Sequence, residues 1–216
     1  MKKLFVLGLA LVMILAGCAT APFQNHPDRF PAVHKPEIRT ILNQKRSGLC
    51  VGYAVANVLF QNGIKLSSEE IDTLYERSRE LYREEGVSIK EEGLPSVRFF
   101  LRAAKEKYPL VKYGEVELSP DGIKKAILAY GPIVVGLIGV DFSGLEKWHL
   151  IKTKPTVLYY RFGLPEGHAV IIDGWDGNNF SIVNSYGERW GNGGKSWIDI
   201  LQLRAGLLEA YWLTVK

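Results

Sequence analysis

The stretch Gln44-Lys-Arg-Ser-Gly-Leu-Cys50-Val-Gly-Tyr-Ala54 places a cysteine directly before a long apolar run. Residues 50–61 are apolar almost all round, and this pattern predicts a buried helix that ends near Asn62-Gly63. A thiol at the start of a helix lies at the positive end of the helix dipole, which favours its ionised form. The stretch therefore predicts a helix with a reactive cysteine at its first residue.

Two polar residues far downstream form a set with Cys50. His168 lies in Gly-His168-Ala-Val-Ile-Ile-Asp-Gly, and Asn184 opens Asn184-Ser-Tyr-Gly-Glu-Arg-Trp-Gly-Asn-Gly-Gly. A thiol, an imidazole and an amide are the parts of a cysteine nucleophile, its base and the group that orients the base. We therefore expect a cysteine hydrolase in which Cys50, His168 and Asn184 are catalytic.

The order of the expected elements indicates the fold class. Helices come first: one over residues 50–61, one from the capping box Ser67–Glu70 to about Arg83, one over 94–107 and one from Ser119-Pro120 to Gly131. Strand-like runs separated by turn residues follow, at residues 133–140, 156–160, 169–173, 180–183, 196–201 and 211–215. This order predicts an α+β protein with a helical N-terminal lobe, an antiparallel β C-terminal lobe and the site in the cleft between them.

The N-terminus carries an export signal. Lys2 and Lys3 precede an uncharged apolar run, residues 4–16, which is shorter than the roughly 20 residues that a spanning helix needs. The run ends in Leu15-Ala16-Gly17-Cys18, which resembles the signal of bacterial lipoproteins. We expect residues 1–17 to be removed and Cys18 to be lipidated, which would anchor the protein to the cell membrane or outer membrane on its extracytoplasmic side. An ordinary signal peptide and an uncleaved anchor helix are the alternatives.

A proline-rich stretch follows the expected lipidation site. Residues 18–37 contain four prolines with polar residues between them, which predicts an extended tether in which His26 and His34 are exposed. Residues 38–216 are then expected to form one domain, which carries the site and acts as a monomer. Because no His, Cys, Asp and Glu set has metal-ligand spacing, we expect neither a metal nor another cofactor.

Charge and cysteine content narrow the function further. The full chain has a net charge of +4, and loss of two lysines with the signal leaves a charge near +2, which is too small to suggest a nucleic-acid partner. The chain has two cysteines, so lipidation of Cys18 would leave Cys50 as a lone thiol in an oxidising compartment. Burial as a small apolar side chain is the alternative role for Cys50, and its neighbours argue against that alternative.

Four segments of the chain resemble the papain-like cysteine peptidases. Gln44 stands six positions before Cys50, as the oxyanion-hole glutamine of that family does. The other three matches are Gly131-Pro132-Ile-Val-Val, Gly167-His168-Ala-Val with Gly174, and Asn184-Ser-Tyr-Gly followed by Trp190-Gly191 and Gly194. The resemblance covers residues 44–216 and implies a two-lobed papain-like fold, thiol protease activity and a peptide or protein substrate.

The resemblance also implies a mechanism. Cys50 would rest as a thiolate paired with protonated His168, and Asn184 would accept a hydrogen bond from the ring. The Gln44 amide and the Cys50 backbone N–H would bind the oxyanion, and Tyr186 would shield the His–Asn contact in place of the family's tryptophan. The sequence departs from the family in having Val51 after the nucleophile, no disulfide cysteines and too few residues before Gln44 for an inhibitory pro-region.

Two other functions are compatible with these residues. One is a cysteine hydrolase that acts on cell-wall peptide crosslinks or other amides. The other is an inactive papain-fold binding module. The presence of Cys50, His168, Asn184 and Gln44 together argues against this alternative, because a protein that only binds need not keep all four side chains.

Overall fold

The computed structural model describes residues 30–34, 38, 40–45, 49–86, 96–140, 142 and 167–216. The chain divides into residues 1–31 and a second unit, residues 32–216. The architecture below is that of the second unit. The predicted signal, Cys18, most of the predicted tether and the predicted strand at 156–160 lie outside the described residues. No helix within the described ranges is long and apolar enough to cross a membrane.

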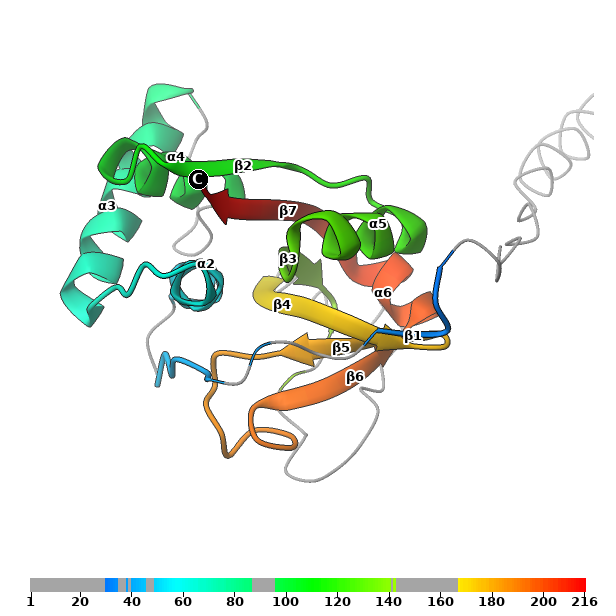
Figure 1. Ribbon diagram of the computed structural model, residues 1–216. Helices are drawn as coiled ribbons and strands as arrows, with labels where there is room; N and C mark the ends of the chain where they lie inside the picture. Colours follow the sequence, from blue (N-terminus) through cyan, green and yellow to red (C-terminus); the bar gives the residue numbers. More distant parts are fainter. Residues whose placement is uncertain are drawn as a thin grey trace, which may run out of the picture. The chain divides into compact units, whose positions relative to one another are not determined.

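An antiparallel sheet runs through the unit (Figure 1). Its strand order is β2-β7-β3-β4-β5-β6, and β1 pairs with β4 outside this path. The strands are β1 Val33–His34, β2 Val111–Glu115, β3 Ile133–Ile138, β4 Gly167–Asp176, β5 Asn179–Val183, β6 Lys195–Asp199 and β7 Leu207–Val215. The backbone of His168, the second residue of β4, is held by pairing with Leu137 of β3, and β5 pairs with β4 from Ile171 onward.

Three consecutive helices share a hydrophobic core with the sheet. They are α2 Cys50–Gln61, α3 Ser68–Glu84 and α4 Val97–Lys107, and the described residues also form α5 Pro120–Tyr130 and α6 Ile200–Gly206. The core joins α2, α3 and α4 to Val134, Ala169 and Ile171 of the sheet. A Cβ at Gly52 of α2 would lie 2.8 Å from Ile71 of α3, so this glycine permits the close approach of the two helices. The prediction of an α+β fold is confirmed.

Local sequence signals explain where several helices begin and end. α2 spans the predicted residues, and Ser67 and Glu70 form the predicted capping box of α3, with Glu70 N–H donating to Ser67 Oγ over 3.2 Å. Ser119 caps α5, and Gly131 ends that helix with a φ of +83°, a conformation that favours glycine. These boundaries could be predicted because they depend on neighbouring residues.

Several predicted boundaries differ from those of the structure, and one strand was not predicted. The run at 196–201 is not one strand, because β6 ends at Asp199, whose carboxylate accepts hydrogen bonds from two backbone N–H groups and starts α6. α4 begins at Val97 rather than residue 94, with Ser96 as its N-cap. β2 was not predicted, because Lys112 and Gly114 weaken its strand pattern and it forms by pairing with β7.

The prediction of an unpacked tether is wrong for residues 32–34. Val33 and His34 pair with β4, and Ala32 O accepts a hydrogen bond from Gly177 N–H over 2.9 Å. The His34 ring is only partly exposed and stacks on Trp175, with 4.8 Å between ring centroids. The packed domain therefore includes residues that precede the predicted boundary at 38, since the end of β4 offers them unpaired backbone groups and an aromatic surface.

A long-range cap should contribute measurably to the stability of the domain. Glu209 of β7 accepts hydrogen bonds from Ser96 Oγ over 2.6 Å and from Val97 N–H over 2.9 Å, at the start of α4. We expect Glu209→Ala to lower the free energy of unfolding by about 1–3 kcal/mol, because the first turn of α4 loses a charged acceptor. Urea denaturation measures this change, with exposed Glu115→Ala as the control. Equal midpoints for the two variants would contradict the role of Glu209.

Candidate active site

The first residue of α2 is Cys50, which is 6% exposed. Leu49 stands at the N-cap position and has no side-chain oxygen to cap the helix. The thiol instead interacts with backbone N–H groups, namely those of Cys50 itself and Val51 at the helix start and that of Ala169 in β4. Because Ala169 follows His168, this contact brings the start of α2 to the strand that carries His168.

His168 and Asn184 form the predicted pair. The ring Nε2 of His168 donates to Asn184 Oδ1 over 2.9 Å, and Asn184 is fully buried. With Nε2 engaged by the amide, Nδ1 is the ring atom left to exchange a proton with a thiol. Asn184 is itself held by a backbone hydrogen bond from its N–H to Gly194 O, 2.9 Å long. The structure therefore brings together two of the residues that the sequence predicted as a base and its orienting group.

Aromatic rings enclose the imidazole. The ring centroids of Tyr186 and Phe142 each lie 4.8 Å from that of His168. Trp190 Nε1–H donates to Phe142 O over 2.8 Å and so fixes Phe142. Tyr186 occupies the shielding position that the sequence predicted. Phe142 was not predicted, since its sequence neighbourhood carries no motif.

Gln44 is bound by Ser185, the residue that follows Asn184. Its backbone N–H donates to Ser185 O over 2.8 Å, and its side-chain Oε1 accepts a hydrogen bond from Ser185 Oγ. Gln44 is 6% exposed. Because its Oε1 is bound by Ser185, the amide NH₂ is the end of the side chain that has donors to offer an oxyanion. Ser185 is a site residue that sequence reasoning did not assign, although it lies inside a recognised motif.

Close packing shapes the backbone around Gln44. Lys45 has a φ of +54°, and Asn43 Oδ1 accepts a hydrogen bond from its N–H over 2.7 Å. Gly187 has a φ of +89°, and a Cβ there would lie 2.3 Å from Asn43 Nδ2. Glycine is therefore required at this position of the Asn-Ser-Tyr-Gly motif for two reasons: the left-handed backbone conformation, and the close approach of Asn43 in the loop before Gln44.

Burial and hydrogen bonding act in opposite directions on the two reactive groups. Burial raises the pKa of the Cys50 thiol, and the N–H groups of Ala169, Val51 and Cys50 oppose this shift. Burial lowers the pKa of the His168 imidazole, and the hydrogen bond to Asn184 opposes that shift. Burial is the larger effect on both groups, so the pKa of Cys50 is raised and that of His168 is lowered. Both directions work against the thiolate–imidazolium pair that the sequence predicted, and the surrounding hydrogen bonds only reduce the shifts.

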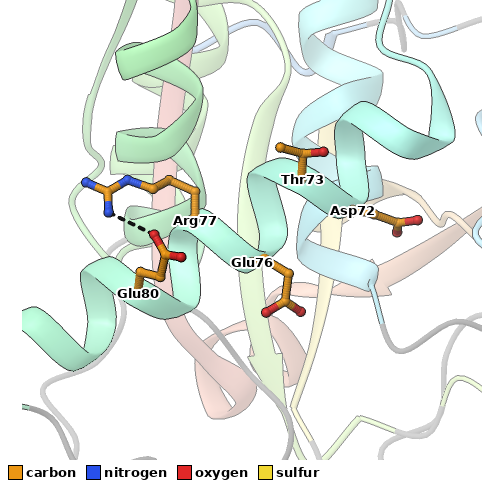
Figure 2. Close-up of a pocket in the computed structure, with 5 residues that line it drawn as sticks. All are labelled: Asp72, Thr73, Glu76, Arg77 and Glu80. Atoms are coloured by element: carbon orange, nitrogen blue, oxygen red, sulfur yellow. Dashed lines mark hydrogen bonds and ion pairs between the residues drawn. The ribbon is translucent and has the colours of Figure 1, made fainter.

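A second surface feature lies apart from this site. An open pocket is lined by residues of α3, which Figure 2 shows as sticks: Asp72, Thr73, Glu76, Arg77 and Glu80. Arg77 forms a 3.0 Å ion pair with Glu80 there. The residues that the structure describes contain no group of three or more His, Cys, Asp or Glu side chains that could hold a metal ion.

Comparison with solved structures identifies the fold. Xylellain, a cysteine protease from Xylella fastidiosa, matches with a TM-score of 0.64 and 16% identity, covering 88% of each chain. A structure of the mite allergens Blo t 1 and Der p 1 matches with a TM-score of 0.59 and 20% identity, covering 95% of this chain and 77% of that one. The Carica candamarcensis cysteine protease CMS1MS2 matches with a TM-score of 0.55 and 16% identity, covering 83% of this chain and 94% of that one.

The chain has the papain-like fold. No family model matches its sequence, and no curated protein does. At these low identities the likeness concerns the fold, and the papain-like fold predicted from four short motifs is confirmed. The roles of Cys50, His168, Asn184 and Gln44 rest on the geometry described above.

The opposing effects on the two pKa values give a pH test. Burial raises the pKa of the Cys50 thiol and lowers that of the His168 imidazole, so each group taken alone favours its neutral form. The proposed ion pair would reverse both shifts, and on that pairing we expect iodoacetamide to alkylate wild-type Cys50 below neutral pH. In His168→Gln the cation is lost and burial remains, so the pKa of Cys50 should lie above its ordinary value and reactivity should disappear as the pH falls from the alkaline range. Alkylation rates across the pH range measure both effects. A wild-type profile that rises only at alkaline pH would rule out the ion pair.

Proposed function

We propose that this chain is a papain-like cysteine peptidase that hydrolyses peptide bonds with Cys50 as nucleophile. The observation that supports this most directly combines two contacts of β4. His168 forms a hydrogen bond with Asn184, and the backbone of Ala169, the residue after His168, contacts the Cys50 sulfur. A base that is oriented by an amide and adjacent to a thiol at a helix start is the arrangement that cysteine nucleophiles require.

The residues of this site divide the reaction between them. The Cys50 thiolate attacks the carbonyl carbon of the scissile bond, and the carbonyl oxygen becomes an oxyanion bound by the Gln44 amide and the Cys50 backbone N–H. When the intermediate collapses, the C–N bond breaks, the amine leaves with a proton from His168, and a thioester on Cys50 remains. Water then attacks the thioester while His168 takes its proton, and a carboxylate and the free thiolate result.

Asn184 and Tyr186 support the base without touching the reacting atoms. Asn184 fixes the ring orientation through Nε2, which keeps Nδ1 available for proton transfer. Tyr186 covers the ring and is 38% exposed, so it separates the His–Asn hydrogen bond from solvent. Excluding water strengthens an electrostatic interaction because the local dielectric constant falls.

The decisive test is hydrolysis of a peptide library by the purified chain. We expect cleavage by the wild type and its essentially complete loss in Cys50→Ser, because neither a helix start nor a neighbouring imidazolium brings a serine hydroxyl near ionisation. An epoxide peptide probe should label wild-type Cys50, with His168→Gln as the control of low reactivity. Labelling without any peptide cleavage would favour a hydrolase of other amides, such as cell-wall peptide crosslinks. The absence of both would favour a binding module.

We also propose that the peptidase is held at a membrane through a lipid on Cys18. The support is the sequence Leu15-Ala16-Gly17-Cys18 after a short apolar run. We expect Cys18→Ala to abolish lipidation and to release the protein from membranes, because acyl chains supply the anchoring energy. Mass spectrometry of the N-terminus and membrane fractionation measure this, with Cys50→Ala as the matched cysteine control. An unmodified Cys18 in the wild-type protein would contradict the anchor.

A further inference from the structure

One polar residue inside the apolar helix α2 has no role in the mechanism above. Asn57 is 1% exposed and lies seven positions after Cys50. Its Oδ1 accepts a hydrogen bond from Leu42 N–H over 2.8 Å, and its Nδ2 donates to Tyr53 O over 2.8 Å. A polar side chain buried in this way is costly unless its groups are paired, so its presence in the helix needs an explanation.

The partner of Asn57 belongs to the loop that carries Gln44. Leu42 lies two positions before Gln44, and its N–H bond to Asn57 ties the loop to the nucleophile helix. At its other end the loop is tied to the β half of the molecule, because Gln44 N–H donates to Ser185 O and Gln44 Oε1 accepts from Ser185 Oγ. The glutamine is thus held between two anchors, of which one lies on the helix of Cys50.

We propose that Asn57 is a positioning residue for the oxyanion hole. Seven helical residues span about 10 Å at 1.5 Å per residue. The hydrogen bond from Leu42 to Asn57 therefore fixes Leu42 at a set distance from Cys50 along the axis of α2. Through Leu42 it sets where the Gln44 amide lies relative to the sulfur. This inference rests on the proposed peptidase function, because it assigns Asn57 a part in binding the oxyanion.

An apolar residue at position 57 would fill the space but not hold the loop. The Leu42 N–H would lose its acceptor, and the loop would have to shift to find another one. A shift of the Gln44 amide weakens a hydrogen bond that matters most in the transition state, where negative charge develops on the substrate oxygen. The expected signature is therefore a loss in kcat with little change in KM.

The chain offers a matched control on the same helix. Asn62 at the end of α2 donates from Nδ2 to Val58 O over 2.9 Å, which is the same bond to the fourth preceding carbonyl that Asn57 makes to Tyr53. Asn62→Leu removes such a bond without affecting the Gln44 loop. Asn57→Leu removes both bonds of Asn57, and Asn57→Ser keeps a hydroxyl that can reach Tyr53 O but is too short to reach Leu42.

The experiment compares peptide hydrolysis with alkylation of Cys50 in these variants. Attack on iodoacetamide occurs at a saturated carbon and forms no oxyanion, so its rate reports on Cys50 and His168 but not on Gln44. We expect Asn57→Leu and Asn57→Ser to lower kcat by about 10- to 100-fold, because small misplacements in a catalytic site have effects of this size. Their alkylation rates should equal that of the wild type, and Asn62→Leu should retain wild-type values in both assays.

A double-mutant cycle with Gln44→Ala tests whether Asn57 acts through Gln44. Gln44→Ala alone should lower kcat by roughly 10²–10³. If Asn57 acts through Gln44, adding Asn57→Leu to this variant should lower kcat by less than about 3-fold further, because the group that Asn57 positions is already gone. The full 10- to 100-fold loss in both backgrounds would overturn the proposal.

The remaining outcomes separate this inference from the proposed function. A wild-type chain that cleaves no peptide contradicts the proposed function itself, and with it the role of Asn57. A wild-type chain that cleaves peptides, combined with an Asn57→Ser variant of unchanged kcat, contradicts the role of Asn57 alone. Slowed alkylation in both Asn57 variants would show that Asn57 supports the Cys50 helix instead of the Gln44 loop. If Asn57→Leu does not fold, as circular dichroism would show, the same comparisons are made with Asn57→Ser.

Discussion

The antiparallel pairing of β4 with β5 is the constraint on which the candidate site depends. The two strands are joined by a tight turn in which Gly177 has a φ of +55°, and their register reaches Ile171 opposite Val183. Asn184 follows Val183 directly and therefore emerges beside the first residues of β4. The 2.9 Å bond from His168 to Asn184 is set by this backbone register, not by the choice of a side-chain conformation alone.

The site joins the helices to the sheet through a pair of adjacent residues. Asn184 accepts from His168, while Ser185 holds Gln44 through both its backbone and its side chain. This dipeptide thus binds both His168, the proposed base, and Gln44, the residue proposed to bind the oxyanion. Helix α2 carries Cys50 and also binds the loop that contains Gln44, because Asn57 Oδ1 accepts a hydrogen bond from Leu42 N–H. His168, Cys50 and Gln44 are consequently held by a small number of shared hydrogen bonds and elements.

Local signals made much of this structure predictable. The apolar run after Cys50, the capping box of α3 and the glycine that ends α5 each depend on neighbouring residues, and each was predicted. β1 and β2 were not, because both are short and form only by pairing with strands distant in sequence. At the site, motif spacing indicated the reactive residues, but Phe142 contacts His168 through tertiary packing that no motif encodes. The rise in the pKa of the Cys50 thiol on burial is likewise a property of the packed core. A prediction based only on the position of Cys50 at a helix start therefore gave too low a pKa.

The two hydrogen bonds between Gln44 and Ser185 join residues 141 positions apart, so they can form only late in the synthesis of the chain. The helix with Cys50 depends on local contacts and can form as soon as its own residues are available. The oxyanion site requires a segment that is synthesised much later, after the histidine strand. If Cys50 and Gln44 act as proposed, the growing chain therefore carries the Cys50 thiol before the segment that holds Gln44 in place has been made.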